Sequence, residues 1–113
     1  IPMQCEYLAL EGLGVMVDLV SQVAQASHRG LHISGILMTM YNPSTNLSQQ
    51  VVQEVIKHFG DRVFETLIPR NVRLSEAPSF GVPVNKHDPY CIGTAAYRSL
   101  AKEFIDRQSQ SAQ

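Results

Sequence analysis

The side chains best placed to do chemistry follow one short apolar run, residues 63–68. Pro69 ends that run, because proline has no backbone N–H to donate to a strand ladder. Pro78 is a second proline that interrupts regular secondary structure. The polar residues between the two prolines are Arg70, Asn71, Arg73, Ser75 and Glu76. Open α/β sheets bind their ligands where strands end in polar loops. The sequence therefore predicts a ligand site in this loop, with an ordinary solvated turn as the alternative.

The motifs of several other kinds of binding or catalytic site are absent from this sequence. There is no glycine-rich phosphate loop followed by lysine, and there is no H-E-x-x-H or G-x-S-x-G pattern. The four histidines and the two cysteines, Cys5 and Cys91, are not at metal-ligand spacings. We therefore expect no metal bound to this chain, and we expect both cysteines to be reduced structural thiols.

Extended and helical patterns alternate along the chain, which predicts an α/β fold with a parallel sheet. Apolar runs at residues 1–5, 31–40 and 63–68 are typical of strands, and apolar spacing predicts helices at 8–25 and 47–59. Thr45 or Asn46 can cap the second helix, and Thr94 can cap a last one. Residues 70–93 are expected to be a loop with a short extended stretch at 81–84, and residues 108–113 a polar tail that frays.

Length and composition indicate one domain with an ordinary core. The chain has 113 residues, of which 44% are hydrophobic, and its formal net charge is −1. That charge does not indicate a nucleic-acid binder, so any DNA contact would need a local basic patch. No apolar run is long enough to predict a membrane span, and no signal peptide is visible. The chain opens inside a strand whose outer edge has no upstream neighbour, so we expect a missing upstream part or a covering partner chain.

Four long motifs resemble the C-terminal half of the ParA/Soj chromosome- and plasmid-partitioning ATPases. They are IPMQCEYLALEGL at residues 1–13, ILMTMYNPSTNLSQQVVQEVIKHFGDRVFETLIPR at 36–70, IPRNVRLSEAPS at 68–79 and GTAAYRSLAKEFI at 93–105. The resemblance implies that residues 1–113 form a single α/β unit of a deviant Walker-type P-loop NTPase. The unit implied by the resemblance has a partial parallel sheet of three main strands with crossover helices. The half that carries the phosphate loop would lie upstream, so this chain alone is not expected to hydrolyse ATP.

The resemblance also implies a nucleotide site at the strand ends, with ATP and Mg²⁺ bound in the full-length protein. Carried over by motif, the adenine pocket comprises Thr39, Met40, Pro69, Arg70 and Asn71. Glu6 would lie near the ribose or the dimer interface. The plainer alternatives are that Met40 fills the core, that Asn71 is a turn residue and that Glu6 is a solvated carboxylate.

Non-specific DNA binding is a further implication of the resemblance. The candidate DNA-binding residues are Arg70, Arg73, Lys86, Arg98 and Lys102. Ser44 stands where the family usually has arginine, and Asn42 where it commonly has aspartate. Basic residues that often follow the Asp-Pro pair are also missing here. Because non-specific affinity grows with the number of phosphates neutralised, we expect DNA binding to be weaker than is typical of the family. Ordinary solvated surface charges are the alternative.

The resemblance implies an ATP-dependent homodimer that is cytoplasmic and nucleoid-associated, with a ParB-like partner that stimulates hydrolysis. A non-catalytic interaction or DNA-binding remnant of such a protein is the first alternative. An ATPase of the MinD type, acting at membranes, is the second. A MinD-type protein predicts a basic amphipathic C-terminal helix, whereas this chain ends in the polar sequence DRQSQSAQ. We therefore expect no membrane partner.

Overall fold

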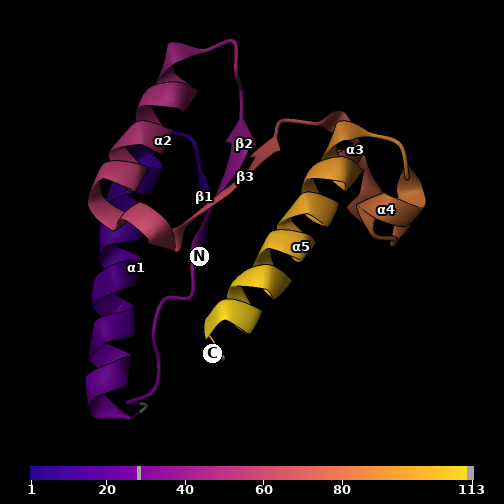
Figure 1. Cartoon of the computed structure of the whole chain (residues 1–113). Coiled ribbons are helices and arrows are strands. Elements are labelled where there is room, and N and C mark those ends of the chain that lie inside the picture. Colours follow the sequence, from indigo (N-terminus) through magenta and orange to yellow (C-terminus); the bar gives the residue numbers. More distant parts are fainter. Residues whose placement is uncertain (28, 112–113) are drawn as a thin grey trace.

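The structure, a computed structural model, describes residues 1–27 and 29–111 (Figure 1). The first part of the chain contains β1 (Pro2–Gln4), α1 (Tyr7–Ala26), β2 (Ile36–Tyr41), α2 (Asn46–Phe59) and β3 (Val63–Pro69). The last part contains α3 (Val72–Glu76), α4 (Val84–His87) and α5 (Ile92–Ser111). Short 3-10 turns lie at Gly60–Arg62 and Ala77–Phe80.

The strands form one parallel sheet in the order β1-β2-β3. Met3 pairs with Met38, and Met38 pairs in turn with Leu67. Parallel neighbours need long crossover connections, which α1 and α2 supply. These two helices lie on one side of the strands, whereas α5 packs against β3 on the other (Figure 1). The arrangement confirms the predicted α/β fold with a partial parallel sheet.

The core lies between the sheet and the pair of helices α1 and α2. One face of α2 supplies three valines to it, at the spacing that the sequence predicts for an amphipathic helix. The buried side chains that make up this cluster are Met3, Cys5, Leu13, Ile36, Met38, Val51, Val52, Val55 and Val63. Because this core holds the strands in register, it also fixes where their carboxyl ends emerge.

Local sequence signals set the ends of α2. Thr45 has an extended backbone, and its hydroxyl accepts a hydrogen bond from the Ser48 N–H at 3.3 Å. Gly60 follows the helix with φ +55°, a conformation that glycine adopts without steric strain. The expected cap and terminator are confirmed, and Thr45 rather than Asn46 is the cap.

The segment between β3 and α5 is more helical than predicted. Residues 72–76 and 77–80 form helical turns, and the extended stretch expected at 81–84 gives way to α4 at Val84. Because α3 has five residues and α4 four, neither is long enough for apolar periodicity to reveal it. The prediction of a plain loop over 70–93 was therefore wrong in these places.

The start of α5 also differs from the prediction. The helix begins at Ile92, and Cys91 precedes it with its Sγ accepting from the Thr94 N–H at 3.4 Å. Thr94 is buried, and its hydroxyl donates to the Asp88 carbonyl at 2.7 Å instead of capping the helix. At the other end, residues 108–111 continue the helix rather than fraying, while residues 112–113 lie outside the described residues.

The strand expected at 31–40 is shorter than predicted, because β2 begins only at Ile36. Gly35 lies directly before it, with the ring of Phe64 so close that a Cβ at this position would collide with it. The backbone therefore passes β3 at a distance that only glycine allows, and residues 31–35 approach without joining the ladder.

Helix α1 carries an exposed apolar stripe in addition to its buried face. Leu8 is 80% exposed and Val15 70%, and Leu19 is also exposed. By length and composition alone, α1 could cross a membrane, although the sequence predicts no span. A single helix of this kind is weak evidence, because core helices of soluble proteins have the same composition.

Candidate functional site

The carboxyl ends of β1, β2 and β3 meet at one edge of the sheet, as parallel order requires. Glu6 follows β1 and Arg70 follows β3, and their side chains form an ion pair with 3.6 Å between Oε1 and Nη2. The Arg70 N–H donates to the Tyr41 carbonyl at 3.0 Å. The structure thus brings together Glu6 and Arg70, which are 64 residues apart in the sequence, across the end of β2. Both side chains are about half exposed.

Met40 has an unusual backbone at the end of β2. Its φ is +54°, in the left-handed region that residues other than glycine rarely adopt. The ladder between β2 and β3 is irregular there, because the register shifts between Met38 and Tyr41. Met40 is half-buried and lies outside the main core cluster. A strained residue held by surrounding structure is characteristic of ligand sites.

Thr39 has a structural role in the same place. Its hydroxyl donates to the Met3 carbonyl at 3.1 Å, and its own carbonyl accepts from the Cys5 N–H at 3.1 Å. These two bonds hold the end of β1 against β2. Thr39 therefore positions Glu6, which follows directly after Cys5.

Asn71 directly precedes α3 and behaves partly as the predicted turn residue. Its Oδ1 accepts from the Arg73 N–H at 3.0 Å and caps the helix. Its amide nitrogen makes no hydrogen bond within residues 1–27 and 29–111, so this donor remains available at the edge of the site. Pro69, the last residue of β3, pairs in register with Tyr41 and is half-buried.

The predicted DNA-binding residues fall into two groups by electrostatic environment. Arg73 contacts Glu76 at 2.8 Å and Asp88 at 3.3 Å, and Arg70 is paired with Glu6 as described above. In contrast, three of the candidates are exposed and form no ion pair in the part of the chain that the structure describes: Lys86 on α4, and Arg98 and Lys102 on α5.

The turn at Asn42–Ser44, where the expected basic residue is missing, is closed by its own side chains. Asn42 Oδ1 accepts from the Ser44 N–H at 3.1 Å and from the Ser44 hydroxyl at 2.6 Å. This Asx turn leads into the Thr45 cap of α2. Asn42 and Ser44 therefore act in local folding, and neither supplies a positive charge.

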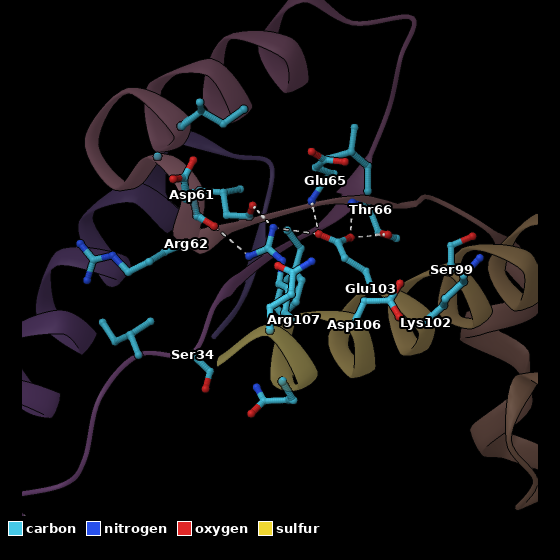
Figure 2. A pocket seen from close by; sticks show the side chains of 18 of the residues that line it. Ser34, Asp61, Arg62, Glu65, Thr66, Ser99, Lys102, Glu103, Asp106 and Arg107 are labelled. Carbon is cyan, nitrogen blue, oxygen red and sulfur yellow. Dashed lines mark hydrogen bonds and ion pairs between the residues drawn. The ribbon is translucent and has the colours of Figure 1, made fainter. Parts of the chain in front are cut away.

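A groove lies away from the strand ends, between α5 and β3 (Figure 2). Of the predicted site residues, only Lys102 lines it. Glu103 and Arg107, on the same helix, point toward the backbone of β3 across this groove (Figure 2). No sequence pattern predicted a role for these two residues. Their i, i+4 spacing is an ordinary helix pair, and their partners are backbone atoms that no sequence motif marks.

Several protein groups donate hydrogen bonds to the Glu103 carboxylate. Burial acts to raise its pKa, but hydrogen bonds from the Thr66 hydroxyl and from the N–H groups of Glu65 and Thr66 act in the opposite direction. The charge of Arg107 adds to these bonds, and together they hold the pKa of Glu103 below its usual value. Glu103 is therefore a charged, hydrogen-bonded group at neutral pH.

Comparison with known proteins gives one family match. The family described as the CobQ/CobB/MinD/ParA nucleotide binding domain matches residues 9–84. This match covers the strand ends of β2 and β3, with Thr39, Met40, Pro69, Arg70 and Asn71 among its residues.

The curated relatives include Soj and ParA proteins of three bacteria. The chromosome-partitioning ATPase Soj of Treponema pallidum is 49% identical over 97% of this chain, and the chromosome partitioning protein ParA of Caulobacter vibrioides is 47% identical over 99%. The sporulation initiation inhibitor protein Soj of Bacillus subtilis is 52% identical over 91%. The matches cover 44%, 43% and 41% of these relatives, so the chain spans less than half of their length. The resemblance to ParA and Soj proteins is confirmed.

Proposed function

This chain belongs to the CobQ/CobB/MinD/ParA nucleotide-binding domain family, and on that premise we propose that it is part of a ParA/Soj-like partitioning ATPase. The observation that carries the proposal is the identity of 47–52% to proteins named Soj and ParA over nearly all of the chain. In the parent protein, ATP would drive a homodimer that binds DNA and segregates a chromosome or a plasmid. A ParB-like protein would stimulate its hydrolysis.

The strand-end site is where we place the adenine of ATP. Met40 offers a soft side chain that can lie against a flat ring, and the free amide nitrogen of Asn71 can donate to a base nitrogen. The ion pair of Glu6 with Arg70 borders this site, consistent with a role near the ribose or the dimer partner. Thr39 and Pro69 hold the strand ends in place.

The phosphates and Mg²⁺ need groups that this chain lacks, since it contains no phosphate-loop motif. We place the phosphate-binding part of the parent ATPase against the open edge of β1 and the exposed apolar stripe of α1. Those two surfaces support the proposal because an unpaired parallel edge and exposed leucines favour burial. The chain alone would then be inactive.

DNA contacts of the parent protein would rest mainly on Lys86, Arg98 and Lys102. These side chains are exposed, whereas the charges of Arg70 and Arg73 are compensated by neighbouring carboxylates. Fewer uncompensated charges neutralise fewer phosphates and displace fewer counterions, so we expect the affinity to be weak and its salt dependence to be shallow.

Nucleotide binding tests the site directly, in the longer protein that carries a phosphate loop together with these residues. Asn71→Ser keeps a helix-capping oxygen but removes the amide donor, so we expect ATP to bind about five-fold more weakly, as for one lost hydrogen bond. Asn85→Ser, on the exposed surface of α4, is the matched control. Equilibrium titration with a fluorescent ATP analogue labelled on the ribose measures both variants.

Two outcomes would contradict the proposal. Unchanged ATP affinity in Asn71→Ser would show that Asn71 is only a helix cap. A parent protein that binds no ATP at all would favour the alternative of a non-catalytic interaction or DNA-binding remnant.

A further inference from the structure

Strand β3 forms the outer edge of the sheet on the side away from β1. Its ladder with β2 is interrupted, because Val63 pairs with Ile36 while Leu67 already pairs with Met38. Four positions along β3 therefore correspond to two along β2, which places a bulge at residues 64–66. A bulge of this kind turns backbone N–H groups out of the ladder and leaves them in need of partners.

Glu103 of α5 satisfies the donors of this bulge. Its Oε2 accepts from the Glu65 N–H at 2.8 Å, and its Oε1 accepts from the Thr66 N–H at 2.9 Å (Figure 2). The Thr66 hydroxyl adds a third bond to Oε1 at 2.7 Å. One carboxylate thus accepts hydrogen bonds from two consecutive backbone N–H groups, on the side of β3 that faces away from β2.

Arg107, one helical turn further, satisfies the acceptors. Its guanidinium donates to the Asp61 carbonyl at 2.8 Å and to the Val63 carbonyl at 3.0 Å. It also pairs with Glu103 at 2.9 Å and stacks over the Phe64 ring, with its Cζ 4.6 Å from the ring centroid. The Glu103 and Arg107 side chains are only 18% and 27% exposed, so the pair is largely shielded from solvent.

Together the two side chains present what a neighbouring strand would present, namely acceptors for the N–H groups and donors for the carbonyls. We propose that Glu103 and Arg107 form an edge cap, which prevents β3 from pairing with the β3 strand of a second copy of this chain. The sequence of β3, VFETLIP, is rich in residues that favour strands, and such a strand tends to self-associate when its edge is open. The sheet can then gain a strand only at β1.

Glu103→Ala tests the edge cap in this protein without nucleotide, so that no ATP-dependent dimer forms. The amides of Glu65 and Thr66 lose their acceptor, and we expect their hydrogen exchange, measured by NMR, to accelerate by about tenfold or more. Sedimentation velocity should then show a dimer that grows with protein concentration. Asp106→Ala removes an exposed carboxylate three residues further along α5 and should behave as the wild type in both measurements.

Glu103→Gln keeps the side-chain length and one oxygen acceptor. If the alanine variant fails to fold, hydrogen exchange in this glutamine variant tests the proposal instead. We expect faster exchange for at least one of the two amides in this variant. Wild-type exchange at both amides in either folded variant would overturn the assignment of Glu103 as their partner. Fast exchange with no self-association at any concentration would overturn the proposal that the cap prevents strand pairing.

Discussion

Met40 is the residue whose backbone is most constrained at the strand ends. Its φ of +54° lies in a region that β-branched side chains tolerate especially poorly. We expect Met40→Ile to destabilise the protein by about 1 kcal/mol or more, whereas Met40→Leu, which is not β-branched, should have a smaller effect. Urea denaturation of the two variants measures the difference. Equal stabilities would mean that the backbone at Met40 relaxes without strain.

The two cysteines differ in the chemistry of their surroundings. Hydrogen bonding with Thr94, through its side chain and its backbone N–H, lowers the pKa of Cys91, whereas burial raises the pKa of Cys5. Since the thiolate is the reactive form, iodoacetamide at neutral pH should modify Cys91 at least about tenfold faster than Cys5. Peptide mass spectrometry over a time course measures both rates. Equal rates in the folded protein would contradict this prediction, and denatured protein, in which the two thiols should react alike, is the control.

Residue types predicted the location of the strand-end site but not its internal contacts. The sequence places Glu6, Met40 and Arg70 after apolar runs, and parallel order is enough to bring such positions to one edge. The ion pair of Glu6 with Arg70 and the left-handed backbone of Met40 depend on strand register and a ladder irregularity. Neither of these features leaves a local signal in the sequence.

At the scale of elements, α5 is held against β3 partly by a charge that can be titrated. The folded protein lowers the pKa of Glu103 below its ordinary value in an unfolded chain. The stabilisation is therefore complete at pH values above the unfolded pKa, and it is lost as the pH falls through the lower folded pKa. Wild type should exceed Glu103→Gln in stability at pH 7, and the gap should shrink toward pH 3.

Urea denaturation at several pH values measures this gap. Asp106→Asn is the control, because the exposed Asp106 carboxylate makes no hydrogen bond or ion pair within the described residues. A gap between wild type and Glu103→Gln that stays constant with pH would mean that the charge of Glu103 does not contribute.

Long elements with strong patterns were predictable, and short ones were not. The valine stripe, the Thr45 cap and Gly60 identify α2 from local signals alone. The helix α4 was missed because it has only four residues, and the start of α5 was misplaced because Thr94 uses its hydroxyl on the carbonyl of Asp88 instead of capping the helix. In both cases tertiary contacts determine the outcome, and a local pattern does not report them.

At the scale of the whole molecule, the proposed DNA contact would rest on basic side chains without carboxylate partners. If the proposed DNA binding holds in the longer protein, replacing both Arg98 and Lys102 by alanine should weaken it and reduce the salt slope by about 1 for each lost phosphate contact. Arg73→Ala should have a smaller effect, because Glu76 and Asp88 already compensate its charge. Fluorescence anisotropy with duplex DNA across a salt series measures the slopes. A larger loss in Arg73→Ala would reverse this ranking.

The position of the edge cap along the chain has a consequence for synthesis on the ribosome. Glu103 comes 34 residues after Pro69, so β3 is translated well before the side chain that covers its edge. At about 5–20 residues per second, roughly 2–7 seconds separate the two. During that interval the nascent chain exposes an apolar strand with free backbone groups. We therefore expect this segment of the nascent chain to be a binding site for holding chaperones.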